Sequence, residues 1–150
     1  MLEIKEFKNL ENKEYWLEQI NSSDWGAGHF LYKLLKSDTF REACGEKSDV
    51  LLLVDGDKLI SFCTFAEKDD IQPTDLTPWV GFVYTFPEFR GNRYAGELLA
   101  YARELAAKEG IEYIYLSTNH IGLYEKYGYE FYEIQKDMDG EDSRVYRQKV

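Results

Sequence analysis

The segment from Trp79 to residue 116 constrains the fold more than any other part of the chain. It opens with Trp79–Thr85, which is almost wholly apolar and aromatic, as strands covered on both faces usually are. Apolar residues then recur at helical spacing over Tyr94–Lys108, and Gly110 ends the predicted helix. A second apolar run, residues 111–116, follows. A strand, a helix and a strand in this order predict a βαβ unit with parallel strands and a right-handed crossover.

The flanking sequence predicts antiparallel hairpins on both sides of this unit. Asp55-Gly56-Asp57 separates the apolar runs 50–54 and 59–65, and Asp-Gly supplies the positive φ of a tight hairpin turn. Asp139-Gly140 separates residues 129–134 from 143–150 in the same way. We also expect a strand at 2–7, helices at 13–20 (capped by Asn12), 29–36 and 120–127, and loops at 21–28 and 67–78. The prediction is an α+β fold, with a mixed, mostly antiparallel sheet around a parallel βαβ centre and helices at its flanks.

Length and charge narrow the class of protein. The 150 residues fit a single domain, 1–150. With 28 acidic against 18 basic residues the net charge is −10, which argues against nucleic acid or an anionic membrane as partner and favours a cationic one. No run approaches the roughly 20 apolar residues of a membrane span, and the N-terminus is too charged for a secretory signal. Cys44, Cys63, His29 and His120 lack metal-site spacing, so we expect a cytoplasmic protein with reduced thiols and no metal.

A loop with small and basic residues joins the central strand to its helix. Its sequence is Phe86-Pro87-Glu88-Phe89-Arg90-Gly91-Asn92-Arg93-Tyr94-Ala95-Gly96. A helix N-terminus presents unpaired N–H groups and a partial positive charge, which suit a phosphate. Gly91, Ala95 and Gly96 leave room for close approach, and Arg90 and Arg93 add positive charge. The alternative is an ordinary strand–helix turn that carries surface arginines.

A second segment, Leu123-Tyr124-Glu125-Lys126-Tyr127-Gly128-Tyr129, follows the βαβ unit. A tyrosine here can point across the end of the sheet toward the loop, where a phenol within hydrogen-bond reach can donate a proton to a leaving group. The alternative for Tyr124, one of 12 tyrosines, is packing.

Together and in this order, the two segments resemble those of the GNAT superfamily of acyl-CoA-dependent N-acyltransferases. The family pattern is a strand, a proline, then [Q/R]-x-x-G-x-[G/A] at a helix start, a strand, and a segment like Leu-Tyr-Glu-Lys-x-Gly-Phe. The resemblance covers residues 79–131, and the order of the elements outside it also agrees. It implies an N-acetyltransferase that moves an acetyl group from acetyl-CoA to a primary amine of a small molecule or peptide by direct attack.

The resemblance also implies roles for individual residues. Tyr124 would be the general acid that protonates the departing CoA thiolate. The backbone of Val83, Tyr84 and Thr85 would hold the pantetheine arm. The pyrophosphate would be held by Arg90, Gly91, Asn92, Arg93, Tyr94, Ala95 and Gly96.

Two positions depart from the family pattern, and the central strand lacks a carboxylate that some members have. The motif's middle glycine is Arg93 here, and Ser117 stands where many members have an asparagine, which leaves Asn119 as the candidate for that cofactor contact. Some members carry a glutamate on the central strand, whereas Trp79–Thr85 contains no carboxylate. His120 is our candidate general base because its ordinary pKa lies near neutrality, with His29 and a water chain as alternatives. For His120 the other interpretation is a local hydrogen bond at a helix start.

In this family the acceptor cleft is lined by the first two helices, their loop and the central strand. That implies Trp25, Phe30, Tyr84 and Trp79 as lining residues, with Asp24 beside them to attract an ammonium group, unless these aromatics are ordinary core. Two other function classes stay open, a non-catalytic acyl-CoA-binding or sensor module and an interaction domain for a basic partner. We expect a monomer, or a homodimer formed through the aromatic closing strands.

Overall fold

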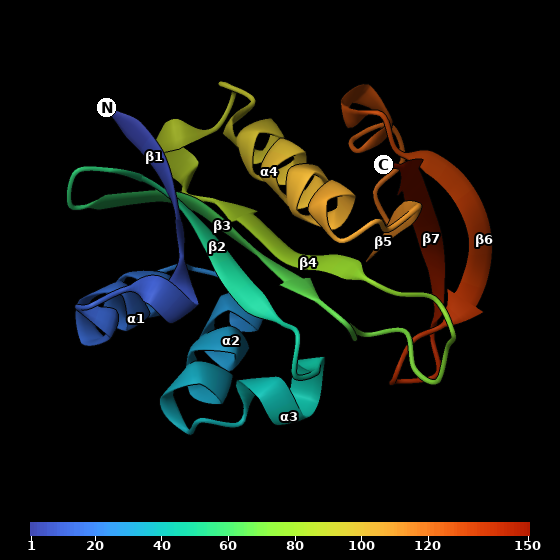
Figure 1. The fold of residues 1–150 in the computed structure, drawn as a ribbon, viewed down its shortest axis with the longest axis horizontal. Coiled ribbons are helices and arrows are strands. Elements are labelled where there is room, and N and C mark those ends of the chain that lie inside the picture. Colours follow the sequence, from blue (N-terminus) through green and yellow to red (C-terminus); the bar gives the residue numbers. More distant parts are fainter.

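One twisted sheet runs through the whole molecule (Figure 1), and the computed structural model describes all of residues 1–150. Its strands are β1 (Leu2–Glu6), β2 (Asp49–Asp55), β3 (Lys58–Ala66), β4 (Trp79–Thr85), β5 (Tyr113–Thr118), β6 (Glu130–Lys136) and β7 (Asp142–Lys149). They lie in the order β1-β2-β3-β4-β5-β7-β6, and every neighbouring pair is antiparallel except β4 and β5. The predicted fold class is confirmed.

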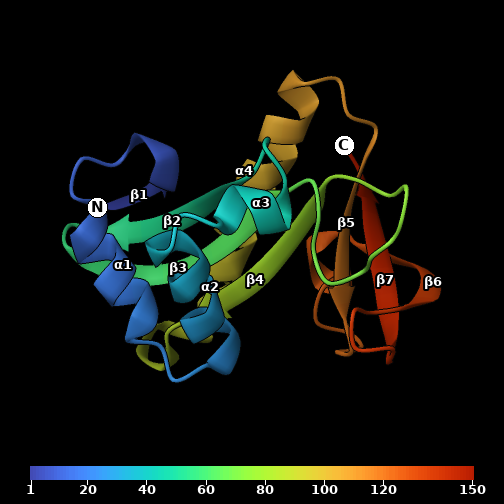
Figure 2. The same ribbon diagram turned by 90° about the horizontal axis from the view of Figure 1, so that it is seen from below.

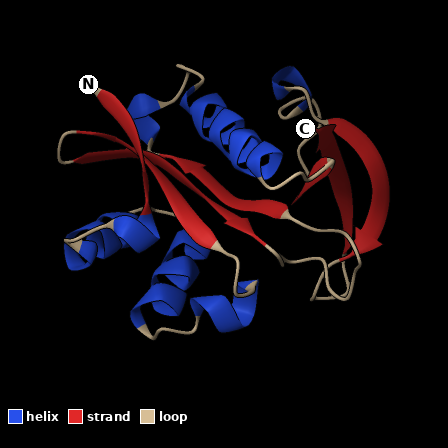
Figure 3. Ribbon diagram, in the orientation of Figure 1, coloured by secondary structure: helices blue, strands red, loops and turns tan.

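Helices cover both faces of this sheet (Figures 2 and 3). They are α1 (Lys13–Asn21), α2 (Gly26–Lys36), α3 (Phe40–Cys44) and α4 (Tyr94–Lys108), with single 3₁₀ turns η1 (Phe7–Asn9), η2 (Pro87–Phe89) and η3 (Glu125–Tyr127). The first three helices pack on one face and α4 on the other. None of them has the length and apolar character that a bilayer crossing requires.

The central βαβ unit has the predicted elements, and its two strands diverge. β4 and α4 begin and end where the sequence predicts, and Gly110 follows the helix with φ +71°. The parallel ladder between β4 and β5 consists of one pair, Trp79 with Tyr115. Beyond this pair the remainder of β4 has no ladder with β5, so a gap opens between the two strands toward the N-terminus of α4.

A β-bulge interrupts β4 just where the strands part. Tyr84 pairs with Phe62 and Gly81 with Thr64, so β4 contains one more residue than β3 between these pairs. Phe82 takes up the extra length with φ +49°, a left-handed conformation that is rare for a bulky residue. Bulges of this kind redirect side chains beside functional sites, and nothing in the sequence of β4 indicates one.

The two predicted hairpins are present, with one addition to their arrangement. β2 and β3 meet at Asp55 and Lys58 around Gly56, which has φ +63°. β6 and β7 also pair, and β7 inserts between β5 and β6. Residues 67–78 form the expected irregular connection between β3 and β4.

Several predicted boundaries were wrong. The helix expected at 120–127 is only η3, because Gly122 has φ +91° and leaves the helical region. Helix α2 starts at Gly26, which shortens the expected loop, and α3 was not predicted. Asn12 stands at the N-cap of α1, but its side chain accepts a hydrogen bond from Trp16 Nε1 (3.1 Å) and not from the helix backbone.

Candidate active site

A cavity of about 350 Å³ lies at the gap between β4 and β5, against the N-terminus of α4. It brings both sequence segments together, although they are far apart in the chain. Its lining consists of Val83, Tyr84, Thr85, Phe89, Arg90, Gly91, Arg93, Tyr94, Ala95, Leu123, Tyr124, Lys126 and Tyr127. The opening of the sheet, the loop and the tyrosine segment therefore form one site.

The loop turns an unbroken run of backbone N–H groups outward. From Gly91 to Ala95 no N–H donates to a protein acceptor, whereas Gly96 N–H donates to Arg93 O (3.0 Å). Gly91 has φ +87° and Arg93 has φ +59°, and these left-handed positions turn successive amides to one side. This conformation explains why a glycine would suit position 93, since a non-glycine residue is disfavoured there by about 1–2 kcal/mol.

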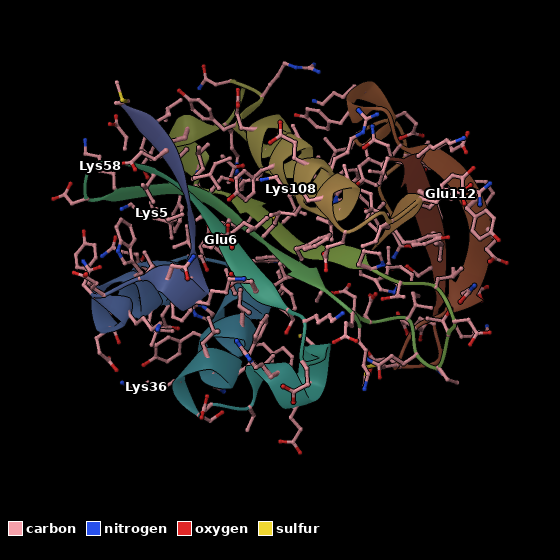
Figure 4. The ribbon with its side chains drawn as sticks, viewed as in Figure 1. Lys5, Glu6, Lys36, Lys58, Lys108 and Glu112 are labelled. Atoms are coloured by element: carbon pink, nitrogen blue, oxygen red, sulfur yellow. The ribbon has the colours of Figure 1, made fainter.

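Three cations surround the cavity, and no carboxylate lines it. Arg90 Nε donates to Thr85 O (2.9 Å), which fixes the guanidinium at the end of β4. Arg93 lies over the ring of Tyr127, 5.0 Å from its centroid, and its Nη2 donates to Lys126 O (3.4 Å). Elsewhere, cations such as Lys36 and Lys58 extend from the rim of the molecule (Figure 4). A chain whose net charge is −10 thus places three cations and no carboxylate in the lining of this cavity.

Two of the predicted loop residues serve the loop itself. The Asn92 side chain donates to Phe89 O (3.1 Å) and Arg90 O (3.5 Å), so it closes the turn before α4. Gly96 does not line the cavity. A Cβ on it would stand 2.7 Å from Cε1 of Tyr127, so its small size lets that ring pack against α4.

Tyr124 is held at the inner wall of the cavity. Its side chain is 8% exposed, and its hydroxyl makes no hydrogen bond within the protein. Burial, followed by the nearby Cys63 and Tyr127, raises the pKa of Tyr124 to about 12, so the phenol stays protonated at neutral pH. Glu125 braces the segment, because its carboxylate accepts hydrogen bonds from Gly122 N–H (3.0 Å) and from the hydroxyl of Tyr146 (3.3 Å).

An aromatic cluster lies on the opposite face of β4, beside the start of α2. Trp25 stacks on Tyr84 with centroids 5.4 Å apart and planes at 10°, and the Tyr84 hydroxyl donates to Asp24 Oδ1 (2.5 Å). That hydrogen bond lowers the pKa of Asp24, so its carboxylate is ionised. Phe30 stacks on Phe82 at 6.3 Å and is 54% exposed.

Trp79, which we expected in the same cleft, lies elsewhere. It is fully buried and packs with Tyr115, Ile71 and Val145 at the far end of β4. The expectation was therefore wrong for this residue, because Trp79 sits where β4 and β5 are still paired.

Comparison with known proteins agrees with this arrangement. The family model of the acetyltransferase (GNAT) family matches residues 11–129, from α1 to the start of the last hairpin. The chain belongs to the GNAT acetyltransferase family. A search of curated protein sequences finds no significant match.

Solved structures of other GNAT proteins share the fold at low sequence identity. An acetyltransferase from Streptococcus agalactiae is 21% identical with a TM-score of 0.67, covering 99% of this chain and 98% of that one. An aminoglycoside 6'-N-acetyltransferase complexed with coenzyme A is 16% identical with a TM-score of 0.71 (98% and 96% covered). An Elizabethkingia anophelis family member with acetyl-CoA bound is 13% identical with a TM-score of 0.67 (99% and 98% covered).

Besides Asn92 and Gly96, two more residues that we predicted for the cofactor or the chemistry of this GNAT protein lie outside the cavity lining. Asn119 and His120 are both exposed after the end of β5. His120 N–H donates to Thr118 Oγ1 (3.0 Å), which is the local hydrogen bond that the alternative interpretation described. His29 is also remote from the cavity lining, and its Nδ1 hydrogen-bonds to Asn21 Oδ1 (3.0 Å).

Sequence reasoning missed other parts of the site. Lys126, Tyr127, Phe89 and Leu123 all line the cavity, although we predicted no role for them. Leu123, Lys126 and Tyr127 stand inside the tyrosine segment itself, so the segment as a whole, and not Tyr124 alone, was the signal.

Proposed function

We propose that this GNAT-family chain transfers an acetyl group from acetyl-CoA to a primary amine of a small molecule or peptide. The observation that carries the proposal is the run of free N–H groups from Gly91 to Ala95, which shares one cavity with the buried phenol of Tyr124. The first feature suits a pyrophosphate and the second suits a departing thiolate. The family and the solved neighbours that hold coenzyme A or acetyl-CoA support the same cofactor.

The residues around the cavity fit acetyl-CoA. The amides of residues 91–95, with Arg90, Arg93 and Lys126, would hold the phosphates by hydrogen bonds and charge. Residues Val83, Tyr84 and Thr85 lie on the part of β4 that pairs with β3 but not with β5, so the backbone on the open side would pair with the amide groups of the pantetheine arm.

The chain's own groups supply the chemistry of the transfer. Bound acetyl-CoA supplies a thioester whose carbonyl carbon an amine can attack. Holding both reactants at the gap makes the step effectively unimolecular, and backbone N–H groups of β4 would stabilise the negative charge on the carbonyl oxygen. Tyr124 would give its proton to the sulfur as the C–S bond breaks, since its raised pKa keeps the phenol protonated until then.

A cationic amine suits the acceptor side. Trp25 and Tyr84 present stacked rings beside the ionised Asp24, an arrangement that attracts an ammonium group through cation–π and charge interactions. Two of the solved neighbours are aminoglycoside 6'-acetyltransferases, so polyamines of that kind belong in a first panel of acceptors.

Two measurements test the proposal. Isothermal titration with acetyl-CoA is expected to show micromolar binding, which the cofactor-free interaction domain does not predict. Thiol release from acetyl-CoA with a panel of amines is expected to show turnover on at least one acceptor. The second candidate function is a non-catalytic acyl-CoA sensor, which the absence of a carboxylate from β4 favours. The sensor predicts that acetyl-CoA binds and that no amine is turned over. A cytoplasmic location and a monomeric or dimeric state stay predictions.

A further inference from the structure

A carboxylate from outside the central strand takes the place that a side chain at Gly81 would occupy. A Cβ built on Gly81 would lie 2.7 Å from Cγ and 2.9 Å from Oδ2 of Asp69. Asp69 belongs to the irregular connection between β3 and β4, so it reaches β4 from the chain that precedes it. The absence of a side chain at Gly81 is what lets this carboxyl group rest on β4 one residue before the bulge at Phe82.

The connection that carries Asp69 is anchored at several points. Gln72 Nε2 donates to Asp69 O (2.7 Å), and Met138 N–H in the β6–β7 turn donates to Asp70 O (2.9 Å). The two segments lie side by side in Figures 1 and 2. The backbone of the connection at Asp69 and Asp70 is therefore held both by its own Gln72 and by the β6–β7 turn.

Asp69 and Tyr124 lie on opposite faces of β4 and its neighbours. Val80 and Val83 pack in the core under α4, together with Tyr124. Because side chains alternate along a strand, Gly81 faces the other side, which after the bulge also carries Tyr84. The Asp69 carboxylate thus lies on the face of the aromatic cluster of Trp25, where the amine is expected.

A second polar group on that face lacks a partner. Thr64 is the cross-strand neighbour of Gly81, so the two residues share a face of the sheet. Thr64 is fully buried, and its hydroxyl makes no hydrogen bond within the protein. A buried hydroxyl without a partner is uncommon, and this one lies on the same face of the sheet as Gly81, against which the Asp69 carboxyl group rests.

The electrostatics make Asp69 a far stronger base than an ordinary aspartate. Burial, and then the neighbouring charge of Asp70, raise the pKa of Asp69 to about 8. The other titratable groups around this pair are Asp137 from the β6–β7 turn and the buried thiol of Cys44 at the end of α3. No lysine or arginine forms an ion pair with either carboxylate. A base matched to neutral pH is what an ammonium substrate requires.

We propose that the Asp69 carboxylate, with the Thr64 hydroxyl on the same face of the sheet, accepts the proton that the substrate ammonium loses before it attacks. The inference rests on the proposed acetyl transfer. Asp69 takes one proton from the ammonium, and the C–N bond then forms as the C–S bond breaks. Tyr124 protonates the sulfur from the other face and regains a proton from the second N–H of the amine. Asp69 releases its proton to solvent, so each turnover yields an amide, a thiol and one proton.

The first test replaces Asp69 by asparagine, which keeps the shape and removes the base. For Asp69→Asn we expect kcat to fall by about 10²–10⁴ while acetyl-CoA binding by calorimetry is unchanged. In the unaltered protein kcat/KM is expected to rise with pH through an apparent pKa that belongs to the Asp69–Asp70 pair, because only the ionised base accepts a proton. Asp69→Asn removes this limb.

Asp70→Asn is the matched control on the same connection. It removes the neighbouring negative charge, so the pKa of Asp69 falls and the limb moves to lower pH, while the rate on its alkaline plateau stays within about threefold. A merely structural role of the acidic pair does not predict this shift. If Asp69→Asn retains turnover and the same pH limb, the proposal is overturned.

A transplant of the carboxylate gives an independent test. Removing Asp69 vacates the space next to Gly81, so the double variant Asp69→Gly, Gly81→Glu puts a carboxylate on β4 itself. We expect it to recover at least tenfold over Asp69→Gly alone, and no recovery in a stably folded double variant counts against the proposal. If the unaltered protein turns over no amine, the proposed acetyl transfer itself fails. That result is distinct from failure of the Asp69 proposal, in which the unaltered protein is active and the Asp69 variants behave like it.

Discussion

Replacing Tyr124 by phenylalanine removes a single oxygen atom and isolates the proposed acid. The hydroxyl of Tyr124 has no hydrogen-bond partner in the protein, so its loss breaks no internal contact and leaves the ring packed. General acid catalysis contributes about 10²–10⁴-fold, which corresponds to roughly 3–5 kcal/mol of transition-state stabilisation at 1.36 kcal/mol per decade. We therefore expect kcat to fall by that factor, with acetyl-CoA affinity and stability almost unchanged.

Tyr129 offers a matched control at the neighbouring ring. Its centroid lies 6.3 Å from that of Tyr124, its side chain is 2% exposed, and its hydroxyl is buried without a partner. A buried polar group left unpaired costs about 1–3 kcal/mol. Tyr129→Phe removes this cost, so we expect a more stable protein, with the melting temperature raised by about 2–4 °C per kcal/mol. Its turnover is expected to match that of the unaltered protein.

The two substitutions thus predict opposite patterns from the same chemical change. Thiol release with one amine measures kcat for both variants, calorimetry measures acetyl-CoA affinity, and urea unfolding measures the free energy of unfolding. If Tyr124→Phe keeps kcat within about tenfold, general acid catalysis by Tyr124 is refuted. If Tyr129→Phe loses turnover as strongly as Tyr124→Phe, the effect comes from the shared packing of the two rings and not from proton transfer.

Substitutions at three further positions test other parts of the site. The Arg93→Gly variant is expected to be more stable than the Arg93→Ala variant by about 1 kcal/mol in urea unfolding, because φ is +59° at this position, and equal stability of the two variants contradicts this. Both variants are expected to bind acetyl-CoA about 5–30-fold more weakly in calorimetry, since both lose the guanidinium. Gly96→Ala is expected to destabilise the protein by about 1–3 kcal/mol in the same unfolding assay, since its Cβ would meet the ring of Tyr127 at 2.7 Å. Asp24→Asn is expected to raise KM for a cationic amine several-fold and to leave KM for acetyl-CoA unchanged, and an unaltered amine KM would remove the carboxylate from substrate binding.

The fold was predictable wherever local sequence and tertiary packing favour the same structure. Over Tyr94–Lys108 the apolar spacing and Gly110 define a helix at its observed ends. The hairpin around Gly56 is equally local, since its turn requires a positive φ. The helix predicted at 120–127 was wrong, although the composition of this segment is typical of a helix. Gly122 takes a left-handed conformation there, and its N–H donates a hydrogen bond to the Glu125 carboxylate. The insertion of β7 between β5 and β6 depends on long-range pairing that no local pattern encodes.

The site was predictable to the extent that it is built from contiguous segments. Residues 83–85, the loop around Arg90 and Tyr124 do line one cavity. The bulge at Phe82 and the approach of Asp69 to Gly81 depend on register and on a connection that folds back across β4. Trp79–Thr85 contains no carboxylate, and the carboxyl group that lies against this strand belongs to Asp69 in the preceding connection. No pattern within the strand indicates that contact.

The net charge of −10 does not prevent a polyanionic substrate from binding, because charge acts locally at physiological salt. The Debye length is about 8 Å at 0.15 M, so exposed charges farther away are largely screened. The lining of the cavity presents Arg90, Arg93, Lys126 and a run of free amides, and no carboxylate. Across the sheet, the ionised carboxylate of Asp24 provides negative charge where an ammonium is expected. Because β4 separates the two groups of charges, an anion and a cation can approach the same gap from opposite faces without competing for one set of partners.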